Sequence, residues 1–157
     1  TPVVFLSFFY ELVSPRALFL DYYTAILMLV WACHGLSYLI STIFNSRSSQ
    51  MAAVVLVLVS VMTSGAEPSL CEMKEKKPLC YALSTSSFAR WFVEALFEKE
   101  ANSYPPVHIQ EVALYSSYQG YSLDNFAYCI VYLLLFGLVS RFIALICLVL
   151  KHRGEQK

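Results

Sequence analysis

The sequence predicts an all-α fold, a polytopic bundle of transmembrane helices, and three observations support this class. Of its 157 residues, 58% are hydrophobic and only 14% are charged. The mean hydropathy of +0.59 is well above the soluble average. The charged residues are clustered, so long stretches have no polar side to offer to water. The 11 basic and 11 acidic residues balance to zero formal charge, which excludes the basic surface that nucleic-acid binding requires.

The first half of the chain is expected to contain one truncated span and two complete ones. Residues 1–12 are apolar but too few to cross a hydrocarbon core of ~30 Å. Because the chain begins at Thr1 with no Met, we interpret this segment as the cut end of a longer protein. Residues 21–44 are long enough to cross at ~1.5 Å per residue. Residues 48–66 reach spanning length only with their first polar residues included, and their Ser-Gly end suggests an early break.

Residues 67–123 are too polar to cross and too long for a simple turn, so we expect them to fold on one face of the membrane. Within this loop, residues 87–100 carry apolar side chains at helical spacing, which predicts an amphipathic helix lying at the membrane interface. Its charged residues Arg90, Glu94 and Glu98 fall on the other side. The spacing of Arg90 and Glu94 favours an i,i+4 pair at the surface.

Residues 124–150 form the last predicted span, with Asp124 and Asn125 as its N-cap, and residues 151–157 form a tail. Basic residues in this tail and at Arg47 in the short connection place both in the cytoplasm, so the loop faces outside. Arg141 interrupts the last span. We expect the helix to slide or tilt until Arg141 lies near the cytoplasmic boundary, where its guanidinium reaches the headgroups and anchors the helix.

Small residues and a histidine stand out inside the spans. Gly35 and Gly137 are expected to let neighbouring helices approach closely. His34 is the only histidine inside a span, and no intramembrane carboxylate is available to partner it. We therefore expect a neutral imidazole that is hydrogen-bonded between helices.

Two of the five cysteines, Cys71 and Cys80, enclose the loop stretch "CEMKEKKPLC". A disulfide between them can form if the loop faces an oxidising compartment, and free thiols remain the alternative. Zinc is less favoured, because His108 is the nearest loop histidine and leaves the ligand set incomplete.

Several segments together resemble a known family. "SPRALFLDYY", "WACHGLSYLI", "FARWFVEAL" and "GYSLDNFAYCIVYLLLFGLVSRFIAL" are similar, in order and spacing, to the C-terminal half of the membrane domain of G-subfamily (White-type) ABC transporters. The plant half-transporters of that subfamily look most similar. The most specific part of the resemblance is a set of residues at matching offsets: Gly120, Tyr121, Asp124, Cys129, Gly137, Arg141 and Ala144.

The resemblance implies part of an ABC-2 type exporter membrane domain, most simply in the plasma membrane. Such a domain couples an ATP-driven conformational change to the movement of lipid-like or other hydrophobic or amphipathic substrates by alternating access. ATP and Mg²⁺ would belong to a missing ATPase domain, because this chain has no G-x-x-x-x-G-K-[ST] loop and is not expected to be an enzyme by itself. The implied partners are membrane lipids, that ATPase domain and a second half-transporter, and no nucleic acid.

The resemblance also assigns expected roles to residues. Arg90, Trp91 and Glu94 are expected near the exit of the transport path, where Ala89 replaces the family's usual proline. For Arg141, the resemblance adds contact with cytoplasmic coupling elements as an alternative to a simple anchor. The residues expected along the substrate path are His34, Tyr38, Phe44 and Met62.

The alternative function is a multi-span membrane scaffold or adhesion protein that transports nothing and acts through its extracellular loop. A channel is less favoured, because no span offers a ring-forming acidic residue or a filter-like glycine run.

Overall fold

The computed structural model describes residues 2–65, 69–76, 78–105 and 109–155, and all regular structure among them is helical. This confirms the all-α prediction. The helices are α1 (Pro2–Val13), α2 (Phe19–Ile43), α3 (Ser46–Met62), α4 (Leu70–Lys76), α5 (Pro78–Ser86), α6 (Phe88–Asn102), α7 (Ile109–Gln119) and α8 (Phe126–Glu155).

Some predicted features fall outside the described residues. These are the expected end of the second complete span at Ala66, the first residues of the loop, the rejected zinc ligand His108 and the last two residues of the tail.

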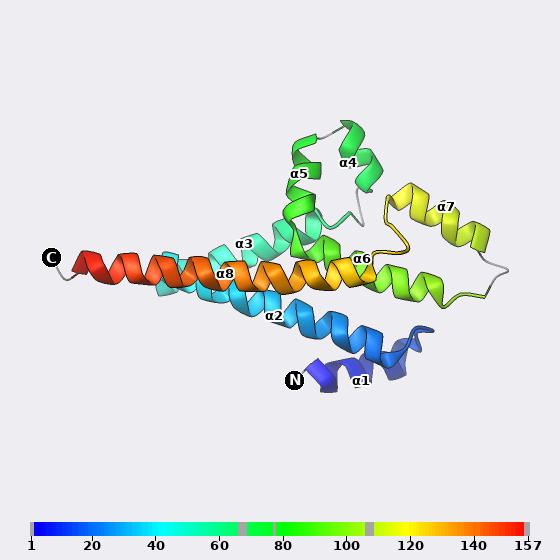
Figure 1. Cartoon of the computed structure of the whole chain (residues 1–157), viewed down its shortest axis with the longest axis horizontal. Helices are drawn as coiled ribbons and strands as arrows, with labels where there is room; N and C mark the ends of the chain where they lie inside the picture. Colours follow the sequence, from blue (N-terminus) through cyan, green and yellow to red (C-terminus); the bar gives the residue numbers. More distant parts are fainter. Residues whose placement is uncertain (1, 66–68, 77, 106–108, 156–157) are drawn as a thin grey trace.

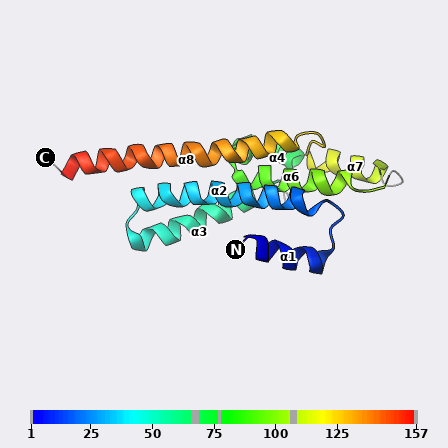
Figure 2. The ribbon, with the colours of Figure 1, turned by 60° about the horizontal axis from the view of Figure 1, so that its bottom comes forward.

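α2 and α8 form the centre of the molecule. They lie side by side and run in the same direction, so both begin at the end where the loop helices gather (Figures 1 and 2). Among the described helices these two are long and apolar enough to cross a membrane, over Phe19–Ile43 and Phe126–Lys151. α8 continues as a helix through the first part of the predicted tail, to Glu155.

The two central helices approach most closely at a pair of glycines. A Cβ atom added to Gly35 would lie 2.6 Å from the carbonyl oxygen of Gly137. At Gly137, the added Cβ would meet the Trp31 ring at 2.5 Å. Neither position has room for a side chain, so backbone contact fixes where α2 and α8 cross.

α3 returns from the far end of α2 and packs against it, which brings the connection at Asn45 toward the same end of the molecule as the C-terminus (Figure 2). α3 stops at Met62, four residues before the predicted end of that span. The reason is local, because Gly65 has a left-handed backbone (φ +93°) and turns the chain away. At 17 residues, α3 is ~25 Å long.

The surface of the helix bundle is apolar. On α3 and the second half of α8, large hydrophobic side chains are exposed along most of the helix, as expected where lipid replaces water. Those on α8 are Val139, Phe142, Ile143, Leu145, Ile146, Leu148, Val149 and Leu150.

The predicted loop contains four helices, α4 to α7, where the sequence indicated only one. α5 descends to the bundle, and the chain turns there into α6, which runs along the bundle (Figure 1). At this turn, the Tyr132 hydroxyl of α8 donates to the carbonyl of Thr85 (3.1 Å), and the Ser87 hydroxyl donates to the carbonyl of Ser60 in α3 (3.0 Å). The turn between α5 and α6 is therefore tied to α8 and to α3.

Candidate functional site

α6 lies inside the bundle, in contact with both α2 and α8. Its first residue, Phe88, packs on Phe136 with ring centroids 5.8 Å apart. Phe136 lies ten residues beyond the start of α8, or ~15 Å along it. At the other end of α6, Lys99 pairs with Asp21 at the start of α2 (3.4 Å) and lies over the ring of Phe126 at the start of α8 (4.2 Å). α6 is therefore packed against both long helices, and its place at the membrane interface stays a prediction.

Trp91 anchors α6 through its indole ring. The ring packs against Tyr132 with centroids 4.6 Å apart and edge-on against Tyr128 at 5.4 Å. Its Nε1–H donates to the carbonyl of Thr85 (3.0 Å). Trp91 is buried together with Ala95, Cys129 and other apolar residues of α2 and α8, so it is a core residue of the described structure.

Arg90 and Glu94 form the predicted i,i+4 ion pair, with Nε and Oε2 separated by 3.7 Å. The pair is not at the surface as expected, because Arg90 is 9% exposed and Glu94 is 2% exposed. The Arg90 guanidinium also lies over the ring of Trp91, 4.6 Å from its centre. Within the described residues, Arg90 Nε, Arg90 Nη1 and Glu94 Oε2 have no hydrogen-bond partner. The buried pair is thus incompletely satisfied, which makes its burial unfavourable and sensitive to movement of α6.

Carboxylates on the polar side of α6 bind main-chain N–H groups that lead into α8. Glu94 Oε1 accepts from Ser122 N–H (3.1 Å), and Glu98 Oε2 accepts from Asn125 N–H (2.9 Å). Asn125 precedes the first residue of α8, and its carbonyl accepts the N–H of Cys129 (2.9 Å). In a capping box, a carboxylate in the first turn of a helix accepts the N–H of its own N-cap residue. Here the carboxylate that accepts the Asn125 N–H comes from a different helix, α6.

Glu100 does the same for α2, a role that the residue pattern does not indicate. Its carboxylate accepts from the N–H groups of Arg16 (3.1 Å) and Ala17 (3.2 Å) and from the hydroxyl of Tyr22 (3.1 Å). These donors lie on both sides of Leu18, the N-cap residue of α2. Because α2 and α8 begin at the same end, one short helix holds the positive ends of both.

Burial changes the acid–base properties of this region. The pKa of Glu98 is raised, first by burial and also by Asp124 and Glu94, while its bond from Asn125 and the charge of Lys99 oppose the rise. Burial and the charge of Glu94 raise the pKa of Tyr121 to about 12. Tyr121 therefore keeps its proton, which its hydroxyl donates to the carbonyl of Ser64 (3.2 Å).

Arg141 occupies the α2–α8 crossing, and its side chain turns back toward the start of α8. Nη1 donates to the carbonyl of Gly137 (3.0 Å) and Nη2 to that of Trp31 (3.3 Å), and the guanidinium lies 3.6 Å from the centre of the Trp31 ring. The guanidinium thus contacts groups of the helix crossing, and the predicted anchoring at cytoplasmic headgroups stays a prediction. Two carbonyls and an indole face take the place of water and lipid around the charge.

The residues expected along the substrate path do not share one pocket. His34 lines a pocket of about 370 Å³ with Trp31 and Leu134, whereas Tyr38 lines a separate one of about 250 Å³ beside Arg141. The predicted interhelical hydrogen bond of His34 is absent from the described residues, and its side chain is exposed.

The other two path residues lie at opposite ends of α3. Phe44 caps the end of α2 just before α3 begins, and Met62 is the last residue of α3. A helix of ~25 Å separates them. Both side chains are exposed.

Cys71 and Cys80 are free thiols in the structure, so it holds no disulfide between them. Cys71 is exposed on α4, and its Sγ–H donates to the carbonyl of Ser117 in α7 (3.4 Å). Within the described part of the chain, no three His, Cys, Asp or Glu residues gather in a way that could hold a metal ion.

Comparison with known proteins identifies the family to which the chain is related. The sequence pattern of the family described as "ABC-2 type transporter" matches residues 1–154. The chain is 33% identical over 147 residues to "ABC transporter G family member 25" of Oryza sativa subsp. japonica, and 30% identical over 150 residues to "ABC transporter G family member 28" of Arabidopsis thaliana. It is 28% identical over 148 residues to "Putative white-brown complex homolog protein 30" of Arabidopsis thaliana.

Each alignment covers 94% of this chain but only 13–14% of the relative, so the chain spans about a seventh of the length of the curated relatives it matches. No solved structure matches. The buried core of α2, α6 and α8 and the apolar outer surface fit a domain embedded in lipid. The chain belongs to the ABC-2 type transporter family and is an integral membrane domain homologous to plant ABC transporters of the G family.

Proposed function

We propose that this chain is the C-terminal part of the membrane domain of an ABC exporter that moves lipid-like or other amphipathic substrates by alternating access. The observation that carries the proposal is the attachment of α6 to the starts of both α2 and α8 through Glu94, Glu98 and Glu100. A shift of either long helix must displace α6. The loop then changes shape whenever the spans move.

In this proposal α4 to α7 face the outside, and α6 controls release of the substrate at the plasma membrane. Arg90, Trp91 and Glu94 form the exit-side gate. The side chains of Arg90 and Glu94 are buried and lack some hydrogen-bond partners, so their burial is unfavourable. Movement of α6 away from α8 lets water or substrate reach these polar atoms. The exposed faces of His34 and Tyr38 on α2 supply contacts for the substrate earlier on the path.

Energy would come from ATP and Mg²⁺ bound by an ATPase domain outside this chain, and a second half-transporter would complete the path. The described residues offer neither a metal-binding cluster nor a phosphate-binding loop for these groups.

The test is lipid movement in proteoliposomes that contain the full-length protein of which this chain is part. We expect ATP-dependent transfer of a fluorescent phospholipid between leaflets. Glu94→Gln should reduce transfer about tenfold, because it removes a charge-assisted hydrogen bond and the partner of Arg90, while ATP hydrolysis continues. The exposed control Glu75→Gln on α4 should leave transfer unchanged. Absence of any ATP-dependent transfer, with partner proteins captured through the loop instead, would favour the scaffold alternative.

A further inference from the structure

Two pockets lie along the line of contact between the long helices α2 and α8. The N-terminal pocket, of about 370 Å³, is lined among the described residues by Leu27, Met28, Val30, Trp31, His34 and Leu134. The C-terminal pocket, of about 250 Å³, is lined among them by Tyr38, Thr42, Arg141, Ala144, Leu145 and Leu148. Both linings are mostly apolar, and Arg141 brings a positive charge to the second.

The two pockets open on the same side of the helix pair. Most of the α2 residues that line them recur every three or four positions and therefore share one face of that helix. These residues are Leu27, Trp31, His34, Tyr38 and Thr42. The α8 residues at matching helical spacing are Leu134, Arg141, Leu145 and Leu148. Because α2 and α8 run side by side in the same direction, the pockets are consecutive parts of one groove, ~22 Å long from Leu27 to Thr42 (Figure 2).

The stack of Arg141 on Trp31 stands between the two pockets. Trp31 lines the N-terminal pocket, and the guanidinium 3.6 Å from its ring centre lines the C-terminal one. The Trp31 Nε1–H is donated to the carbonyl of Leu134 (3.4 Å), so the ring offers carbon atoms to the groove. Trp31 is 39% exposed, and a flexible chain can therefore lie over it from one pocket to the other.

The charge of Arg141 has no carboxylate partner within the described part of the chain. Its contacts there are two carbonyls and the Trp31 ring. The two candidate spans contain one acidic residue, Asp21, which pairs with Lys99 (3.4 Å) and lies ~21 Å along α2 from the crossing at Gly35. A positive charge in apolar surroundings is stabilised when an anion approaches it. The groove therefore favours a ligand that carries a negative charge.

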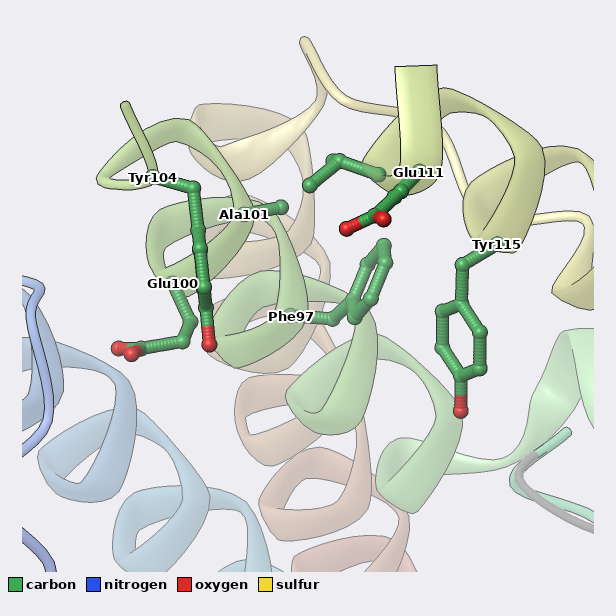
Figure 3. A pocket seen from close by; sticks show the side chains of 7 residues that line it. Phe97, Glu100, Ala101, Tyr104, Glu111 and Tyr115 are labelled. Carbon is green, nitrogen blue, oxygen red and sulfur yellow. The ribbon is translucent and has the colours of Figure 1, made fainter. Parts of the chain in front are cut away.

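The pocket between α6 and α7 differs in this respect. Its lining includes Phe97 and Glu100. Figure 3 shows the oxygens of Glu100 directed away from Phe97, and they accept from the N–H groups of Arg16 and Ala17. The charge of Glu100 already holds the start of α2, whereas the charge of Arg141 lies beside a pocket whose described lining has no opposite charge.

We propose that the groove binds a long-chain fatty acid, with its carboxylate beside Arg141 in the C-terminal pocket and its chain in the N-terminal pocket. Tyr38 lines the same pocket as Arg141 and is 59% exposed, so its hydroxyl is available to donate to the carboxylate. From Tyr38 to Leu27 the groove runs ~17 Å, close to the ~15 Å that one leaflet contributes to the hydrocarbon core. A single narrow groove fits one chain, which favours a fatty acid over a two-chain phospholipid.

The position of the C-terminal pocket suits this orientation. The pocket extends from Arg141 to Leu148, which lies three residues before the end of the α8 span at Lys151. Its far end is therefore ~5 Å from the end of that span. The carboxylate can enter from the level of the headgroups while the chain stays in the hydrocarbon region. The site needs only that the chain is embedded in lipid, so it does not depend on the transport proposal.

The test uses the full-length protein that contains this chain, without nucleotide, in nanodiscs of phosphatidylcholine. The probe is palmitic acid with a photoreactive diazirine in its chain, and mass spectrometry locates the cross-links. We expect cross-links on α2 between Leu27 and His34 and on α8 near Leu134, and we expect unlabelled palmitic acid to compete. The alcohol with the same chain, at the same mole fraction in the bilayer, should give about tenfold less product because it lacks the charge that Arg141 attracts.

Two variants test the two ends of the ligand separately. Arg141→Gln removes the charge and should reduce cross-linking by palmitic acid about tenfold. Lys151→Gln removes a positive charge from the end of the same span and should leave cross-linking unchanged. Leu134→Trp keeps Arg141 but fills the N-terminal pocket, and it should reduce cross-linking by a similar factor. Leu135→Trp adds the same ring one position along, at a residue that is 52% exposed, and serves as its control.

Thermal unfolding of each variant identifies those that still fold. The proposal is overturned if the alcohol labels the groove as strongly as the acid, or if folded Leu134→Trp is labelled like the parent. Labelling spread evenly over the exposed face of α3 would also overturn it, because the probe would then report only surrounding lipid. No labelling of α2 or α8 would overturn it in favour of another helix of the protein as the occupant of the groove.

Discussion

Arg141 and Trp31 form the one charged contact at the crossing of the described parts of α2 and α8, with the guanidinium 3.6 Å from the ring centre. Two main-chain carbonyls, one from each helix, complete its surroundings. A positive charge inside an apolar bundle is thereby used to join two helices.

We expect Trp31 and Arg141 to be energetically coupled. In a double-mutant cycle with Trp31→Leu and Arg141→Met, the coupling free energy should be about 0.5–2 kcal/mol, the range for a cation over an indole face. The measurement is the free energy of unfolding in detergent micelles. Strictly additive effects of the two substitutions would show that the stacking contributes nothing.

Gly35 should tolerate no side chain. Gly35→Val places Cβ within 2.6 Å of the Gly137 carbonyl oxygen, so the helices must separate. We expect a loss of about 1–3 kcal/mol in the free energy of unfolding. Ser37→Val, on the exposed side of α2, introduces the same β-branched residue and serves as the control. Equal losses in the two variants would contradict the close contact and point to helix propensity instead.

Glu98 should make stability depend on pH. Because its pKa is raised in the folded protein above the ordinary value of 4.5, the folded state binds the proton more tightly. This group's contribution to stability is then fully present below pH 4.5 and is lost as the pH rises through the raised pKa. Unfolding midpoints measured from pH 4 to 8 should fall less steeply in Glu98→Gln than in the parent. The same slope in both proteins would show that other groups cause the dependence.

Cys71 should react with a membrane-impermeant thiol reagent added to intact cells, because its side chain is exposed on α4 and bears no disulfide. Mass spectrometry of the labelled peptide gives the readout, and Cys71→Ser provides the control. Cys80 is only partly exposed and should react more slowly. Labelling that requires permeabilised cells would place α4 to α7 on the cytoplasmic side and would reverse the proposed topology.

The sequence predicted the helical class because a long apolar segment in a membrane must satisfy its own backbone hydrogen bonds, and an α-helix does so within one segment. It predicted α6 as a helix with nearly the correct bounds, but it did not predict that the charged side of this helix is buried. The periodicity shows that Glu94 and Glu98 share one side of α6, and it cannot show which N–H groups will face them. The main-chain donors to Glu94 and Glu98 lie just before α8, and those to Glu100 lie just before α2, all far from α6 in the chain. Only the tertiary structure brings these N–H donors close enough to bind the carboxylates of α6.

Arg141 illustrates a second limit. Its position in the sequence allows the side chain to point toward either end of the helix, and the free-energy cost of burying a charge favours the direction of the nearer headgroups. In the structure the guanidinium contacts protein groups, which a hydropathy profile cannot predict. Because Gly137 has no side chain, the Trp31 ring and the Arg141 guanidinium both fit beside it.

The contact between Gly35 and Gly137 also divides α8 into two unequal lever arms. From Gly137 the helix extends 11 residues back to Phe126 and 18 residues forward to Glu155, or ~17 Å and ~27 Å at 1.5 Å per residue. With the crossing as fulcrum, a tilt of about 10° would move the longer arm by roughly 5 Å at its tip and the shorter one by roughly 3 Å. A large displacement of the C-terminal end of α8 would thus produce a smaller displacement at its N-terminal end, where α6 is bound.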